Sequence, residues 1–130
     1  MNGNIIIKCF INNYIEKEIF IVTWTVKVKH TRPNTDVDFY TADGATDGHQ
    51  LSSSDFAYYL TTYKETGKFI NRISSFSEDG LEVTRTLIWK DEATKNEYVQ
   101  DSRMAAALIA HEEYNTLNNI TKVKLQDEET

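Results

Sequence analysis

The chain has 130 residues, of which 40% are hydrophobic and 12% aromatic, and 14 basic against 20 acidic side chains give a formal net charge of −6. This length supports one hydrophobic core and is too short for two ordinary domains, so we expect a single domain over residues 1–130. Nucleic-acid binding needs clustered Lys and Arg. The scattered basic residues and the acidic balance therefore argue against a nucleic-acid partner.

The single cysteine, Cys9, cannot form an internal disulfide, which is typical of a reducing compartment. The longest aliphatic stretches are far shorter than a membrane span, and no signal peptide is recognisable. We therefore expect a cytoplasmic protein with no membrane partner. Frequent Asn, Ile, Lys, Thr, Asp and Tyr are typical of AT-rich coding sequence. Such a composition would suit a phage protein, located in the host cytoplasm or the virion, or a low-GC bacterium.

Two strands are predicted near the start of the chain. Residues 5–11, "IIIKCFI", form a short strand candidate that Asn12 and Asn13 can end, since Asn tolerates turn conformations. In residues 20–28, "FIVTWTVKV", apolar residues alternate with Thr and Lys, the period-2 pattern of a half-buried strand. The sequence therefore predicts one continuous strand over 20–28 and an additional strand before it.

A long loop insertion is predicted over residues 30–51, because the apolar residues there follow neither the alternation of a strand nor the 3.6-residue period of a helix. Loops of this length are uncommon inside a compact domain and are usually functional, mobile or locally folded. Phe39 and Tyr40 lie among acidic residues and could be aromatic anchors for a protein partner. A solvent loop without a partner is the alternative interpretation.

The same loop carries possible metal ligands, but their spacing does not match a known site. A calcium loop needs alternating carboxylates, a turn glycine and a closing Glu within 12 residues. The stretch "DVDFYTADGATDGHQ" breaks that spacing and lacks the Glu. We therefore predict no metal site.

The middle of the chain reads as a helix followed by a hairpin. Ser53 and Ser54 are helix N-cap candidates, and Gly67 is a stop. Asp79-Gly80 favours a two-residue turn between strands over 69–77 and 81–90. This register would pair Phe76 with Val83, Ser74 with Arg85, Arg72 with Leu87, and Ile70 with Trp89.

Two helical segments and a strand are predicted to follow. Asp91 can cap a helix that extends to Val99, and Asp101 or Ser102 can cap a second segment that stops near Asn118. A last strand over 120–125 precedes an acidic tail, 126–130, which we expect to fray.

The resulting order is strand, helix, strand, strand, helix, strand. This is the βαββαβ arrangement of ferredoxin-like folds. We therefore predict an α+β protein with an antiparallel sheet, two helical segments packed on one face, and an extra N-terminal strand.

At this level a family resemblance becomes visible. The run "GLEVTRTLIW" through "KDEATKNEY" resembles the dimeric α+β barrel group, the antibiotic-biosynthesis-monooxygenase-like proteins, in which a third strand ends in Trp and leads into an acidic, Ala-containing helix start. The pattern covers residues 19–125, and the sequence likeness covers about 20 residues. The resemblance implies a homodimer or higher homo-oligomer with sheets paired face to face. The strand face bearing Arg72, Arg85, Leu87 and Trp89 should then lie at the interface or line a pocket.

The resemblance also implies an enzymatic alternative. Branches of the group perform oxygen chemistry on polycyclic substrates or degrade haem, the latter with an Asn, Trp and His constellation. Trp89 and His111 could occupy comparable elements, but the 20–28 strand has no Asn. A lone His beside apolar residues is more often a packed core residue, so we predict no cofactor.

No nucleophile, acid or metal cluster with named neighbours is recognisable, so we predict no catalytic residue. We expect a non-catalytic binding or assembly module that acts as an oligomer. The alternative is a cofactor-independent monooxygenase or haem-binding enzyme, which would need an enclosed pocket near Trp89, Arg85 and His111. The candidate binding residues are Arg72, Arg85, Trp89, His111, Phe39 and Tyr40.

Overall fold

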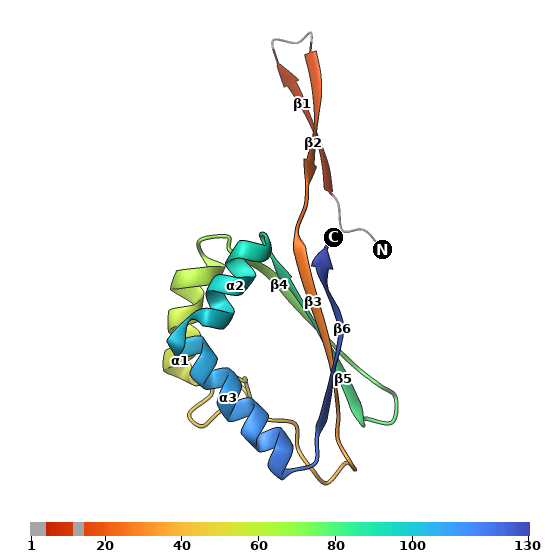
Figure 1. Ribbon diagram of the computed structural model, residues 1–130, viewed down its shortest axis with the longest axis vertical. Coiled ribbons are helices and arrows are strands. Elements are labelled where there is room, and N and C mark those ends of the chain that lie inside the picture. Colours follow the sequence, from red (N-terminus) through yellow and green to blue (C-terminus); the bar gives the residue numbers. More distant parts are fainter. Residues whose placement is uncertain (1–4, 12–14) are drawn as a thin grey trace.

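Three helices cover one face of a four-stranded antiparallel sheet in the computed structural model, which describes residues 5–11 and 15–130, with side chains from Ile21 onward (Figure 1). The strand order of this sheet is β4-β5-β3-β6, so the protein is α+β and compatible with a ferredoxin-like arrangement. The elements are β1 (Ile5–Ile11), β2 (Ile15–Ile21), β3 (Trp24–Thr31), α1 (Ser53–Tyr59), the π-helical turn η1 (Leu60–Lys64), β4 (Phe69–Phe76), β5 (Glu82–Trp89), α2 (Glu92–Gln100), α3 (Ser102–Leu117) and β6 (Thr121–Glu129).

The N-terminal strands form a separate hairpin. β1 pairs with β2 in a two-stranded sheet that extends away from the end of β3 (Figure 1). The prediction of one continuous strand over 20–28 is therefore wrong. β2 ends at Ile21, and Thr23 instead exchanges backbone hydrogen bonds of 3.1 and 2.9 Å with Thr130. The change of pairing partner interrupts the strand although the sequence alternation continues. The predicted turn at Asn12 and Asn13 lies outside the described residues.

The β4–β5 hairpin has the predicted register over most of its length. Three of the predicted pairs are confirmed: Phe76 with Val83, Ser74 with Arg85, and Arg72 with Leu87. The two-residue turn is wrong, because Ser77 N donates to Glu82 O and only Gly80 of the central pair has positive φ. A bulge between Phe69 and Asn71 places Phe69, not Ile70, opposite Trp89. Phe69 is consequently buried while Ile70 is exposed.

The C-terminal residues belong to the sheet. β6 pairs with β3 as far as Glu129 opposite Trp24, and the Thr130 side chain is buried against Thr23 and Thr25. The prediction that residues 126–130 fray is therefore wrong. The tail is acidic and has few apolar residues, but its backbone N–H and C=O groups form hydrogen bonds with β3. This pairing holds the tail in the sheet.

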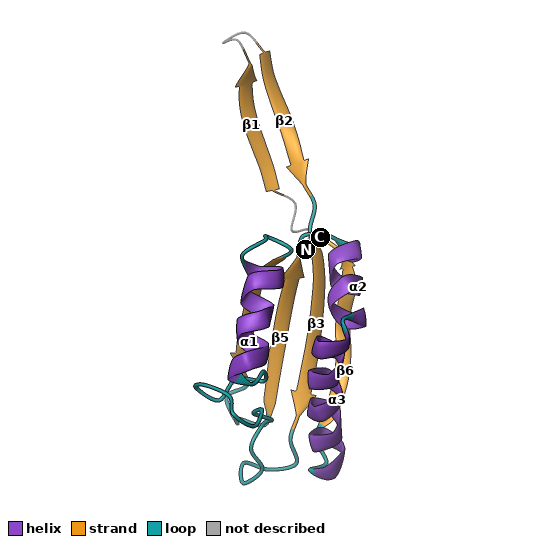
Figure 2. Ribbon diagram, turned by 90° about the vertical axis from the view of Figure 1, so that its left-hand side faces the viewer, coloured by secondary structure: helices purple, strands orange, loops and turns teal. Residues whose placement is uncertain are grey.

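The helices all lie over one face of the sheet, which we call the inner face (Figure 2). The predicted caps of α2 and α3 are confirmed: Asp91 begins α2, Asp101 begins α3, and Asn118 ends α3. The N-cap candidates Ser53 and Ser54 are wrong, because the side chain of Ser52 accepts from Asp55 N and caps α1. A buried hydrophobic cluster joins the helices to the sheet, and its members are Tyr63, Phe69, Trp89 and Met104. Within the described residues, no helix is both long and apolar enough to cross a membrane.

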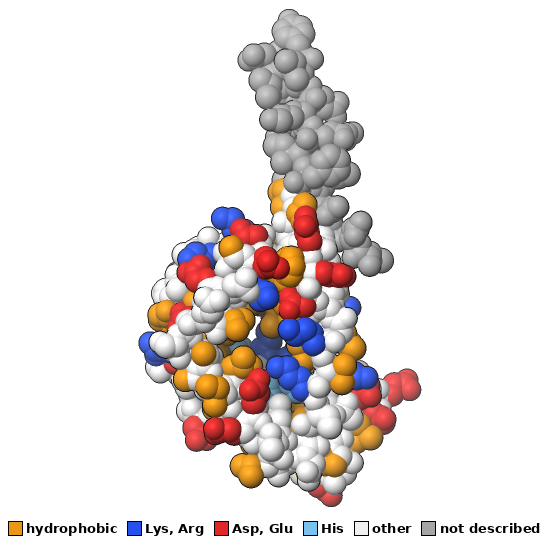
Figure 3. Space-filling model, in the orientation of Figure 1, with side chains coloured by type: hydrophobic (Ala, Val, Ile, Leu, Met, Phe, Trp, Pro, Cys, Tyr) orange, Lys and Arg blue, Asp and Glu red, His pale blue; other side chains and the backbone are white. Residues whose placement is uncertain are grey.

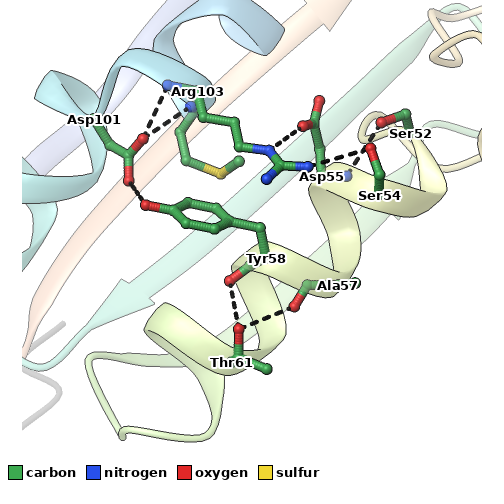
Figure 4. A network of polar contacts seen from close by, with 9 residues as sticks. Ser52, Ser54, Asp55, Ala57, Tyr58, Thr61, Asp101 and Arg103 are labelled. Carbon is green, nitrogen blue, oxygen red and sulfur yellow. Dashed lines mark hydrogen bonds and ion pairs between the residues drawn. The ribbon is translucent and has the colours of Figure 1, made fainter.

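Asp101 ties the three helices together. Its Oδ1 accepts from the backbone N–H groups of Arg103 and Met104, and its Oδ2 accepts from the phenol of Tyr58 at 2.5 Å (Figure 4). Oδ2 also accepts from the phenol of Tyr63 at 2.7 Å. Burial alone would raise the pKa of Asp101, but these hydrogen bonds hold it below its usual value. Arg103 adds an ion pair of 2.7 Å to Asp55 of α1.

Replacing Asp101 should therefore destabilise the fold more than replacing an ordinary helix cap. We expect Asp101→Ala to lower the free energy of unfolding by roughly 2–4 kcal/mol, because it removes a cap and leaves two phenols without a partner. Asp91→Ala is the matched control, since Asp91 caps α2 without phenol partners, and should lower it by about 1 kcal/mol. Urea denaturation measures both, and equal losses would contradict the clamp role of Asp101.

Candidate functional site

A cavity of about 360 Å³ lies between the inner face of the sheet and helices α2 and α3. Its walls come from β3, β4, β5, β6, α2, α3 and residues 49–51 of the long loop. Figure 3 shows this hollow near the middle of the molecule, with blue Lys or Arg and pale-blue His side chains in and around it. Another depression, lined by Ile109, Leu117 and three polar residues between them, belongs to α3 alone and has no opposing wall.

Two arginines from neighbouring strands face this cavity. Since Arg72 pairs with Leu87 and Ser74 pairs with Arg85, the two arginines are diagonal neighbours on the inner face. Both are half-buried, and neither forms an ion pair with a carboxylate among the described side chains. Burial, followed by the charge of Arg72, lowers the pKa of Arg85 to about 10, which still leaves it charged at neutral pH.

Each of these arginines contacts a histidine. Arg72 Nη1 lies 3.2 Å from His49 Nε2, and Arg85 Nη1 lies 3.4 Å from His30 Nδ1. A guanidinium only donates, so the facing ring nitrogen must be the unprotonated acceptor. Arg85 Nε is buried and has no hydrogen-bond partner. The cavity therefore contains cationic donors whose protein partners are neutral.

The remaining charges around the cavity are paired. Lys95 and Lys124 lie 3.4 and 2.9 Å from the carboxylate of Asp127. Lys122 lies 3.6 Å from Glu112. The cavity is thus electropositive in a chain whose net charge is −6.

An aromatic stack closes the cavity on the loop side. The His111 ring lies 4.8 Å from Tyr40 and 5.0 Å from His30, centroid to centroid. Burial, with Arg85 and Lys122 nearby, lowers the pKa of His30 to about 4. Burial and the charge of His30, followed by Arg85 and Lys122, lower the pKa of His111 to about 3. Both rings are therefore neutral at pH 7.

Part of the cavity lining is apolar. The Trp89 ring lies 4.8 Å from both Phe69 and Tyr98, and α3 contributes Met104 and Ala107. A ligand in this cavity would therefore meet both cationic donors and aromatic carbon.

Four of the predicted binding residues meet at this cavity, namely Arg72, Arg85, Trp89 and His111. Their strand face is covered by the protein's own helices, so placing it at a dimer interface is wrong and the pocket alternative holds. His30, Lys122 and Lys124 also line the cavity, although they were not among the predicted binding residues. The alternation in β3 could have revealed His30, since it shares a face with Trp24, Val26 and Val28.

Phe39 and Tyr40 contact their own domain. Tyr40 stacks on His111, and Phe39 lies between Arg32 and Phe76, 4.8 Å from the guanidinium carbon and 6.3 Å from the phenyl centroid. Tyr114 Oη also donates to Asp38 O at 2.7 Å. The segment after β3 is thus held against α3, and its role in binding a partner stays a prediction.

A scan of the chain against protein-family models gave no match, and a search of curated protein sequences gave none either. The resemblance to the dimeric α+β barrel group stays a prediction. Among the described side chains, no group of three or more His, Cys, Asp or Glu residues is arranged to hold a metal ion.

The neutral histidines should make stability depend on pH. A histidine with a lowered folded pKa contributes its full stability above the unfolded pKa of about 6.5 and loses it as pH falls toward the folded pKa. Between pH 7.5 and 5.5, His30 and His111 should each remove about 1 kcal/mol from the free energy of unfolding. Urea denaturation at both pH values measures this loss.

Two variants identify the source of that pH dependence. His111→Gln should flatten it by about 1 kcal/mol, because the titrating ring is removed. Lys68→Gln, a surface change at the Glu97 ion pair, should keep the wild-type dependence. Equal free energies of unfolding of the wild-type protein at pH 7.5 and 5.5 would contradict the conclusion that His30 and His111 are neutral in the folded protein.

Proposed function

We propose that this domain binds a small organic acid in the cavity between the sheet and the helices. The acid group lies against Arg72 and Arg85, and the apolar body lies against Trp89, Phe69 and Tyr98. The observation that supports this proposal is the pair of half-buried arginines with no carboxylate partner among the described side chains.

A cation removed from water is costly unless it is paired and hydrogen-bonded. Each of the three lysines at the cavity lies beside a carboxylate, with Lys95 and Lys124 sharing Asp127, but the arginine side chains hydrogen-bond only to neutral histidines. Arg85 Nε has no acceptor at all. An anionic ligand in the cavity supplies the missing negative charge.

The size and lining of the cavity agree with a small-molecule site. Such sites enclose about 300–1,000 Å³, with mostly apolar walls and a few polar groups that fix orientation. The cavity here, at about 360 Å³, suits a ligand of one or two rings.

A matched ligand pair tests the proposal. Benzoate should bind with a measurable heat in titration calorimetry, while benzamide, which has the same shape but no charge, should bind at least about tenfold more weakly, a difference of about 1.4 kcal/mol. Arg85→Met should abolish the preference for the acid. Arg103→Met removes an equal charge outside the cavity, at the Asp55 ion pair, and should keep it.

A second variant separates cavity binding from surface binding. Ala107→Phe fills the cavity from α3 without changing its charge and should abolish benzoate binding. Binding that survives both Ala107→Phe and Arg85→Met would overturn the proposed site.

The non-catalytic role is part of the proposal, and an enzymatic alternative shares the same cavity. A cofactor-independent oxygenase needs an enclosed pocket near Trp89, Arg85 and His111, and these three residues line the cavity. Recovery of a bound aromatic acid unchanged after incubation in air supports the binding role, whereas an oxygenated product supports the alternative.

The residues do not fit haem. The His111 ring is neutral and stacks with Tyr40 and His30. Arg85 and Lys122 lie close enough to act on its pKa. The broad apolar face of a porphyrin does not match this cationic lining, so we derive no haem chemistry.

We also propose that two copies associate through the outer face of the sheet, which no helix covers (Figure 2). Ile73 and Val123 are about half exposed there, at 50% and 48%. Light scattering at micromolar concentration should give twice the 15.0 kDa chain mass. Ile73→Asp should shift the mass toward the monomer, whereas Thr84→Asp would do so less, since it removes no apolar contact. A wild-type monomer would contradict this association.

A further inference from the structure

We infer that the natural ligand of the cavity is a dianion, in which one head group carries two negative charges, as in an organic phosphate monoester. This inference rests on the proposed function, because it specifies the charge and shape of the acid that the cavity binds.

The charge of the lining supports two negative charges on the ligand. Five Lys and Arg residues line the cavity against two acidic residues. Asp127 pairs with both Lys95 and Lys124, and Glu112 pairs with Lys122, so two of the five positive charges are balanced and three are not. Arg72 and Arg85 have no carboxylate partner among the described side chains, so one negative charge on the ligand would leave at least one of these guanidinium groups uncompensated.

The positions of the two arginines favour one shared head group. They are diagonal neighbours on β4 and β5, within reach of each other's side chains. The charge of Arg72 also lowers the pKa of Arg85, as expected for two cations that face one volume. A head group between them contacts both guanidinium groups at once.

The hydrogen-bond geometry favours three oxygens over two. A carboxylate has two oxygens, and both can accept hydrogen bonds from a single guanidinium group. A phosphate monoester has three terminal oxygens, so it can accept hydrogen bonds from two guanidinium groups at once. Within residues 21–130, each guanidinium uses one Nη1 contact to a histidine, and Arg85 Nε has no partner. The pair therefore has more free donors than one carboxylate can accept.

The neutral histidines fit the same ligand. His49 and His30 accept from the arginines and do not add acidic groups that would compete for them. They fix the arginines in place while the positive charge stays available to the ligand. Carboxylates at these positions would instead neutralise the site.

Phenyl phosphate and phenyl sulfate test the inference, because both present a tetrahedral oxyanion on the same ring. At pH 7.5 the phosphate carries close to two charges and the sulfate carries one, since the second pKa of a phosphate monoester is about 6. Titration calorimetry with the wild-type protein should give at least about tenfold tighter binding of phenyl phosphate. In Arg72→Met this preference should fall below about threefold, and in Arg103→Met it should persist.

Arg72→Lys is a second variant that covers the case in which Arg72→Met does not fold. It keeps the positive charge at this position but replaces the bidentate guanidinium group with an ammonium group, so the preference for phenyl phosphate should decrease only in part. Equal wild-type affinities for phenyl phosphate and phenyl sulfate would overturn the dianion inference and leave the proposed function intact. Failure of benzoate and of both these ligands to bind would overturn the proposed function itself.

Discussion

The two half-buried guanidinium groups of Arg72 and Arg85 limit how closely the helices can pack on the sheet, because a buried charge needs a partner. At the Trp89 end of β5, aromatic side chains pack directly against Tyr63 and Met104. At Arg85, an equally tight contact would enclose a charge without a partner, which is costly. The helices therefore pack closely at one end of the inner face, and a cavity of about 360 Å³ remains where the arginines lie.

The charge arrangement around this cavity separates structural cations from available ones. Lys95 and Lys124 share the carboxylate of Asp127, and Lys122 pairs with Glu112. The arginines instead contact histidines that burial keeps neutral. His30 also belongs to the stack with His111 and Tyr40, which connects the arginine site to the long loop. The arginine site and the position of this loop are therefore physically linked.

Local features were well predicted because they depend on nearby residues. Asp91 and Asp101 cap helices through amides two or three residues away. The β4–β5 register could be predicted from the turn around Gly80, and the alternation of Arg85, Leu87 and Trp89 placed them on one face. The bulge at Phe69 could not be predicted, since it depends on which side chain fits beside Trp89. The break at Thr23 and the ordered tail likewise depend on a partner 107 positions away.

The sequence by itself determined that Arg72, Arg85 and Trp89 share one strand face, because side chains alternate with a period of two. Only the tertiary structure decided that this face lies under the helices, with His111, His49 and Lys122 around the arginines. Periodicity shows which residues lie together on a strand but does not show which face the crossover helices cover. The charge balance of the cavity depends on contacts between distant elements, so it exists only in the folded chain.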